Sequence, residues 1–162
     1  MARRIIKNQF VSKANIILFG TGNSGKTTTL RILYYLLTGT TAPANKTRVQ
    51  ITYKGSKIDF AFNGDTLDVV EGNVAFFEDN PCDIAVSPTR TDGGPVIAMN
   101  YFIDKTFPMT ENIIWKKVAD IPVAKRASKG HLVAPKNYAK NYPQSSFLAS
   151  KLKNIIDDYI NN

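Results

Sequence analysis

Cysteine and histidine are almost absent from this chain, which has one of each among 162 residues. A single cysteine, Cys82, excludes an internal disulfide framework and a cysteine-rich metal site, and we expect it to be a buried thiol. A single histidine, His131, excludes metal or proton-relay chemistry that needs two imidazoles. We expect His131 to be structural or exposed to solvent.

Long apolar runs are missing as well, because no stretch approaches the roughly 18 residues that span a bilayer. The basic N-terminus is followed by no apolar segment, so it does not read as a secretory signal. Apolar residues make up 43% of the chain, which is enough to build a core. We expect a soluble, cytoplasmic, single domain over residues 1–162 with no membrane contact, whose residues 1–13 form a basic, loosely held arm.

Acidic residues are absent from the first third of the chain, although the net charge of the whole is +8. Residues 1–57 carry a net charge of +10, residues 58–111 carry −8, and residues 112–162 carry +6. Two basic segments around an acidic one favour an anionic partner, such as a nucleotide, a nucleic acid or a phosphorylated metabolite. No zinc-finger spacing or alternation of basic and aromatic residues singles out nucleic acid among these.

The apolar periodicity predicts an α/β fold with strands and helices in alternation. A glycine turn separates two segments with period-2 alternation, which indicates an antiparallel hairpin. We expect a three-layer, mainly parallel sheet with this hairpin at one side. The expected strands are 16–19, 49–53, 58–62, 84–86 and 112–115, and the expected helices are 27–37, 66–77, 95–105 and 146–160.

Two stretches between these elements are expected to be irregular. Residues 87–94 are rich in glycine and proline and read as a loop. Residues 119–145 contain three prolines and many lysines, and no element is assigned to them. Arg126 and Lys129 in this second stretch are candidates for a basic lid that closes over phosphates. A solvated basic loop is the alternative.

One segment carries a specific chemical signature, the pattern G-x-x-x-x-G-K-[ST] between the first strand and the first helix. Its glycines let successive backbone N–H groups face phosphate oxygens, and the start of the helix adds its positive dipole end. Lys26 is expected to reach the β- and γ-phosphates, and the Thr27 hydroxyl to ligate Mg²⁺. The expected phosphate-binding residues are Gly20, Thr21, Gly22, Asn23, Ser24, Gly25, Lys26, Thr27 and Thr28.

On this motif the sequence resembles the P-loop NTPase superfamily, with a specific match that covers about residues 15–40. The resemblance implies an enzyme of the P-loop sheet type that binds a nucleoside triphosphate with Mg²⁺ as cofactor. The guanine-reading pattern N-K-x-D is missing, because arginine occupies the aspartate position in the segment Asn45–Arg48. We therefore favour ATP over GTP.

Two further residues are expected at the carboxyl edge of the sheet, where open α/β sheets bind ligands. Asp65 resembles a Walker B aspartate, or the aspartate after the switch hairpin of small GTPases, and is a candidate Mg²⁺ ligand or base. Helix capping is its alternative role. Arg90 lies in a segment that loosely resembles the P-R-T turn of nucleoside monophosphate kinases, which implies a contact with the acceptor phosphate. Thr89 interrupts that pattern, so a surface arginine is the alternative.

Two classes of function follow from these residues. The first is a kinase that moves the γ-phosphoryl group of ATP to a phosphorylated, nucleotide or nucleic-acid acceptor, with Lys26, Asp65 and Arg90 as catalytic residues. The second is a small nucleotide switch or accessory ATPase that acts through a protein or nucleic-acid partner, with Thr40 or Thr41 as a γ-phosphate sensor. The sequence names neither the acceptor nor the oligomeric state.

Overall fold

The computed structural model describes six parts of the chain and confirms the α/β class predicted from the sequence. Strands and helices alternate in it as the apolar periodicity indicates. Residues 1–11 of the expected arm, the expected helix at 95–105 and residues 119–141 of the stretch 119–145 lie outside the described residues, whereas α5 already begins at Pro143 within that stretch. The structure describes residues 12–20, 25–43, 45–64, 66–90, 112–117 and 142–161.

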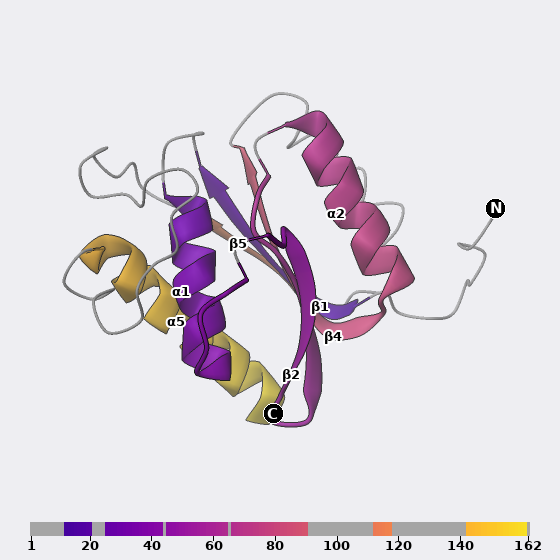
Figure 1. The fold of residues 1–162 in the computed structure, drawn as a ribbon. Helices are drawn as coiled ribbons and strands as arrows, with labels where there is room; N and C mark the ends of the chain where they lie inside the picture. The colour runs from indigo at the N-terminus through magenta and orange to yellow at the C-terminus, as the bar shows by residue number, and fades with distance from the viewer. Residues whose placement is uncertain are drawn as a thin grey trace.

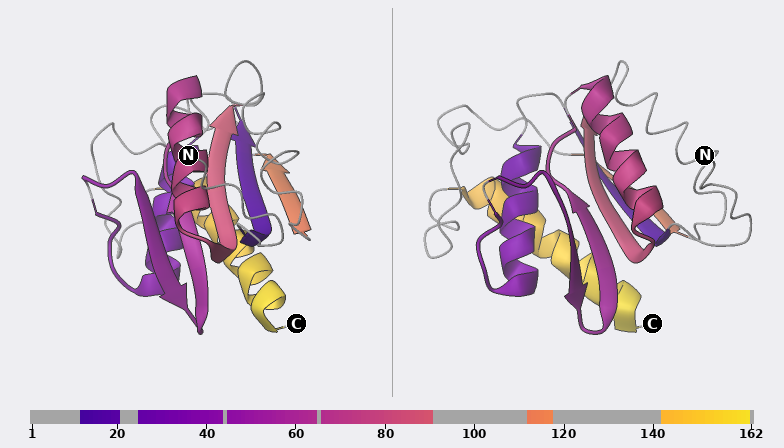
Figure 2. Two further views of the ribbon diagram at one scale, coloured as in Figure 1. Left: turned by 90° about the vertical axis from the view of Figure 1, so that its right-hand side faces the viewer. Right: turned by 45° about the vertical axis from the view of Figure 1, so that its right-hand side comes forward.

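A five-stranded mixed sheet forms the centre of the described fold, in the order β2-β3-β4-β1-β5. All neighbouring strands are parallel except β2 and β3, which form the expected antiparallel hairpin. The left view of Figure 2 shows the hairpin at one side of the sheet and β5 at the other. The strands are β1 (Ser12–Gly20), β2 (Arg48–Tyr53), β3 (Ser56–Ala61), β4 (Cys82–Arg90) and β5 (Asn112–Lys117).

Three helices of the described chain cover the two faces of this sheet (Figure 1). α1 (Lys26–Thr38) and α5 (Pro143–Asn161) pack together on one face. α2 (Leu67–Asp79) lies on the other face, which makes three layers. None of the described helices is long and apolar enough to cross a membrane.

The main core lies on the face that α1 and α5 cover, and it is built almost entirely from apolar side chains. Because side chains alternate along a strand, every second residue of β1, β3 and β4 points to it. Tyr34 meets Phe60 edge to face, with 5.8 Å between the ring centroids, while Phe60 and Phe62 are stacked. The strands supply Ala14, Ile16, Leu18, Ile58, Phe60, Ile84 and Val86, and the helices Leu30, Ile32, Leu33, Tyr34, Ala149, Leu152 and Ile156.

Helix boundaries follow the local signals in the sequence. α1 ends at Gly39, whose φ of +78° is left-handed and whose N–H donates to the Tyr35 carbonyl. Thr66 caps α2, because its hydroxyl accepts a hydrogen bond of 3.3 Å from the Val69 N–H. Thr66, the first residue of the expected helix 66–77, is therefore the N-cap of α2.

β1 and β4 extend well beyond the strands that the sequence predicts. β1 begins at Ser12, inside the segment expected to be an arm, and β4 continues to Arg90 instead of ending in a loop at Ser87. β4 continues because β1 runs beside it as far as the pair Gly20–Arg90. Pro88 lies beyond the part of β4 that pairs with β3, which ends at Val86, and its neighbour in the sheet is Leu18 of β1.

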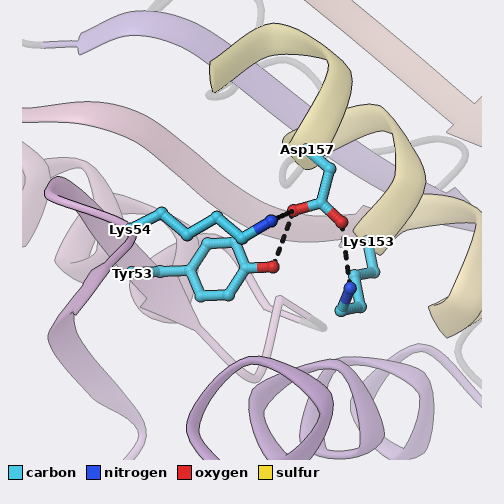
Figure 3. Close-up of polar contacts among 4 residues, drawn as sticks. All are labelled: Tyr53, Lys54, Lys153 and Asp157. Carbon is cyan, nitrogen blue, oxygen red and sulfur yellow. Dashed lines mark hydrogen bonds and ion pairs between the residues drawn. The ribbon is translucent and has the colours of Figure 1, made fainter. Parts of the chain in front are cut away.

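Asp157 of α5 ties the C-terminal helix to the turn of the β2–β3 hairpin (Figure 3). Its carboxylate accepts a hydrogen bond of 2.6 Å from the Tyr53 hydroxyl and pairs with Lys54 at 3.3 Å and with Lys153 at 2.9 Å. Partial burial works to raise the pKa of this carboxyl, but its hydroxyl and ammonium partners outweigh that effect and bring the pKa to about 2.

We predict that Asp157→Asn lowers the free energy of unfolding at pH 7 by about 1–2 kcal/mol, because the amide keeps the shape but loses the charge. The pKa of Asp157 is about 2 in the folded chain and about 4 in the unfolded one, so its contribution is present above pH 4. The gap between wild type and variant should therefore close as the pH falls from about 4 to about 2. Urea unfolding across this pH range measures it.

Asp158→Asn is the matched control, because it makes the same charge change at the next residue, which is exposed. It should leave the free energy of unfolding within about 0.5 kcal/mol of wild type. A gap for Asp157→Asn that is as large at pH 2 as at pH 7 would contradict the role given to the carboxylate.

Candidate functional site

The Walker A match lies at the junction of β1 and α1, at the carboxyl edge of the sheet. Gly20 ends β1, residues 21–24 lie outside the described part, and Gly25 precedes α1 with a φ of +85°, a left-handed conformation that favours glycine. No described side chain makes a cap hydrogen bond at this end of the helix, and its first turn holds no acidic residue. The positive end of the α1 dipole therefore favours an anion bound at the start of the helix.

The first turn of α1 carries the two side chains expected to meet phosphate and metal. Lys26 is 4% exposed and engaged in contacts within the protein. The Thr27 hydroxyl donates a hydrogen bond of 2.7 Å to the carbonyl of Phe62, the residue just after β3. A hydroxyl that donates its proton keeps two lone pairs, so Thr27 can still face a cation.

Phe62 joins α1 to the connection that precedes the hairpin. Its N–H donates to the Thr47 carbonyl at 2.9 Å, and the guanidinium of Arg31 lies 4.9 Å from the centre of its ring. Arg31 also donates to the Pro43 carbonyl at 3.2 Å. One residue therefore contacts the first two turns of α1 and the start of the hairpin together.

The chain leaves β3 by crossing over the end of β4. A Cβ placed on Gly64 would lie 2.1 Å from the Pro88 carbonyl oxygen, so only glycine fits this position without a shift of the backbone. β4 separates β3 from β1 in the sheet, and this close crossing is what brings the end of β3 toward the Walker A strand. The sequence predicts the hairpin but gives no sign of this spatial order.

Asp65 itself lies outside the described residues, but both of its neighbours are placed. Gly64 is buried against Pro88, and Thr66 supplies the side chain that caps α2. The capping role that was the alternative for Asp65 therefore already belongs to Thr66.

Arg90 ends β4 and pairs in register with Gly20, the first residue of the Walker A match. Its backbone thus lies beside the motif, and only the backbone is described for this residue. The candidate lid residues Arg126 and Lys129, and His131, are outside the described residues as well. Trp115 lies in β5, where the backbone alone is described.

Thr40 does not lie where a γ-phosphate sensor is needed. It follows the C-terminal cap of α1, and its hydroxyl lies 3.1 Å from that of Thr38. A helix of 13 residues is about 20 Å long, so Thr40 is a helix length away from Lys26. Thr41 follows Thr40 and therefore also lies beyond the C-terminal end of α1.

A buried carboxylate, that of Asp59 in β3, lies beside Ala85 of β4, away from the motif. Burial raises the pKa of Asp59 to about 6. The hydrogen bond of 2.8 Å that it accepts from Gln50 lowers the pKa but does not offset the effect of burial. Burial also raises the pKa of the neighbouring Cys82 thiol, which therefore stays protonated at neutral pH. Cys82 is a free cysteine that is only partly buried, whereas a buried thiol is expected from the sequence.

Among the described residues there is no cluster of three or more histidine, cysteine, aspartate or glutamate side chains. Mg²⁺ does not require such a cluster in nucleotide sites, where it commonly keeps several waters and uses one or two protein ligands plus phosphate oxygens. No family model matches the sequence, and comparisons with curated proteins and with solved structures give no match.

We predict that Gly64→Ala destabilises the protein by about 3 kcal/mol, because the new methyl group must displace either the β3–α2 connection or the end of β4. For a chain of this length this corresponds to a fall in Tm of roughly 6–12 °C. Thermal unfolding followed by circular dichroism measures the change.

Gly55→Ala is the control for this substitution. Gly55 lies in the hairpin turn with a φ of +82°, and a Cβ there meets nothing within 4 Å. Its cost is backbone strain alone, about 1 kcal/mol. Equal losses of stability in the two variants would show that the contact with Pro88 does not constrain the crossing.

Proposed function

We propose that this chain is an ATP- and Mg²⁺-binding P-loop NTPase that transfers the γ-phosphoryl group of ATP to an anionic acceptor. The observation that carries the proposal is the Thr27 hydroxyl, which follows the Walker A lysine and donates to Phe62 at 2.7 Å. This hydrogen bond directs the hydroxyl proton away and leaves oxygen lone pairs for a metal. The uncapped start of α1 behind a left-handed Gly25 supports phosphate binding at the same place.

The residues of the motif divide the work in this proposal. Backbone N–H groups from Gly20 to Thr28 hold the phosphates, and Lys26 neutralises charge on the β- and γ-phosphates. Thr27 holds the metal together with Asp65. Mg²⁺ held there would supply neutralisation of the phosphate charge. Catalysis then consists of positioning and electrostatic stabilisation, as phosphoryl transfer requires.

The acceptor follows from charge. The chain carries a net charge of +8, which favours a phosphorylated small molecule, a nucleotide or a nucleic acid over a neutral acceptor. Arg90 would contact the acceptor phosphate from the end of β4, beside Gly20 in the sheet. Arg126 and Lys129 would close over the phosphates as a lid.

A nucleotide switch is the second candidate, and one set of contacts favours it. Phe62 links Thr27 to the Thr47 carbonyl, and thus to the first residue of the hairpin. A change at the metal-binding hydroxyl would reach the edge of the sheet through one residue. Such a protein would hydrolyse ATP slowly and need a partner for full turnover.

We predict that Lys26→Ala weakens the binding of a fluorescent ATP analogue with Mg²⁺ by about 10- to 100-fold, because a charge-assisted contact to phosphate is lost. Lys57→Ala removes the same charge from an exposed position of β3 and should bind as wild type does. Fluorescence titration of the three proteins tests the proposal. Wild-type affinity in Lys26→Ala would contradict it.

Phosphorus NMR separates the two candidates. Mg-ATP is incubated with the wild-type protein and with a pool of nucleosides, nucleoside monophosphates and short oligonucleotides. A new phosphorylated species with one acceptor supports the kinase and names its substrate class. ADP and free phosphate at a rate that no acceptor changes support the switch.

A further inference from the structure

Arg48, the first residue of β2, crosses the polar face of the hairpin to reach α2. Its Nε donates to the Asn73 side-chain oxygen at 2.8 Å, and one terminal nitrogen donates to the Val69 carbonyl at 3.2 Å. Gly72 makes room for the guanidinium, because a Cβ there would lie 2.2 Å from it. The arginine thus lies flat on α2, and its planar fork fixes both contacts.

Asn73 connects Arg48 to the end of β3 through two hydrogen bonds. Its side-chain nitrogen donates to the Asn63 carbonyl at 2.8 Å, while its oxygen accepts from Arg48. The two partners fix the amide orientation, because turning it over would set an N–H group against the guanidinium. The residue is 1% exposed, so water does not replace either partner.

The Asn63 carbonyl is one residue from the Phe62 carbonyl, which accepts the hydrogen bond from Thr27. The backbone here is held from both sides: α2 holds Asn63 through Asn73, and α1 holds Phe62 through Thr27. Gly64 presses against Pro88 at the next position. Any rotation of this short segment changes the direction of the Phe62 carbonyl and with it the direction of the Thr27 hydroxyl.

We propose that Asn73, held by Arg48, is a positioning residue that fixes the Phe62 carbonyl and thereby turns the lone pairs of Thr27 toward the metal of a bound Mg-nucleotide. The proposal rests on the proposed function and deepens it, since it assigns the Mg²⁺-dependent part of nucleotide affinity to two residues on β2 and α2. Neither residue touches the nucleotide. Residues behind a metal ligand commonly control metal affinity in this way.

Asn73→Asp is the sharpest test, because it changes one of the two hydrogen bonds and keeps the other. An aspartate still accepts from Arg48, now as an ion pair, but it has no N–H to donate to Asn63. The affinity for the fluorescent ATP analogue is measured once in excess EDTA and once in Mg²⁺. The readout is the affinity in Mg²⁺ divided by the affinity in EDTA. We expect this ratio to fall about tenfold, with the affinity in EDTA unchanged.

Asn80→Asp is the matched control at the other end of α2. Asn80 donates from its side chain to the Phe76 carbonyl at 2.9 Å, so the substitution removes the same kind of hydrogen bond from the same helix. It should lower Tm because this hydrogen bond is lost, and it should leave the Mg²⁺ ratio as in wild type. A fall of the ratio in both variants would reduce Asn73 to a general stabiliser of α2 and overturn the proposal.

Failure of this inference differs from failure of the proposed function. If wild type shows no gain in affinity with Mg²⁺, the proposed function fails and the inference with it. If wild type shows the gain and Asn73→Asp keeps it, the inference alone is wrong. Should Asn73→Asp not fold, Arg48→Lys retains one donor for Asn73 and loses the contact with Val69. It should lower the ratio about threefold, and an unchanged ratio would overturn the proposal.

Discussion

A hydrogen bond of 2.7 Å from the Thr27 hydroxyl to the Phe62 carbonyl joins the first turn of α1 to the end of β3. The two elements are not neighbours in the sheet, because β4 lies between β3 and β1. The bond forms only because the chain crosses the end of β4 at Gly64, where the Pro88 carbonyl leaves no room for a side chain. The hydrogen bond of Thr27 thus depends on both the strand order and the absence of a side chain at Gly64. The candidate metal site lies where these elements come together.

The two faces of the sheet contribute differently to stability and to the site. The face under α1 and α5 is apolar, whereas the face toward α2 buries Asn15, Asp59 and Thr89. Within the described chain, the Asn15 amide, one Asp59 oxygen and the Thr89 hydroxyl have no hydrogen-bond partner, and the same is true of the Ser145 hydroxyl of α5, at a cost of about 1–3 kcal/mol each. The α2 face also carries an apolar cluster that includes Ile17, Val70 and Phe77. The α2 side depends more on directional hydrogen bonds, such as those of Arg48 and Asn73, which suits a part that must hold a precise geometry.

The sequence predicts the kinds of elements well, because their signals are local. Period-2 alternation fixes the hairpin, and Thr66 is an ordinary helix cap. The position of β4 between β3 and β1 depends on pairing between distant strands, and no local pattern encodes it. The same holds for the contact of Asn73 with Asn63, since a mid-helix asparagine gives no sign of its partner. The motif at Gly20–Thr27 identifies the candidate site, but the residues that support it become visible only in three dimensions.

In the proposed function, a Mg-nucleotide binds at the start of α1 and changes the environment of the residues at the end of β3. Backbone amide NMR of the wild-type protein, titrated with Mg²⁺ and an ATP analogue with a non-hydrolysable β–γ bridge, tests it most directly. We expect the largest shifts at Gly25–Thr28 and, through the Thr27 hydroxyl, at Phe62 and Asn63. Adding Mg²⁺ after the nucleotide should move the second group further. Shifts confined to other elements, or none at saturating nucleotide, would contradict the claim.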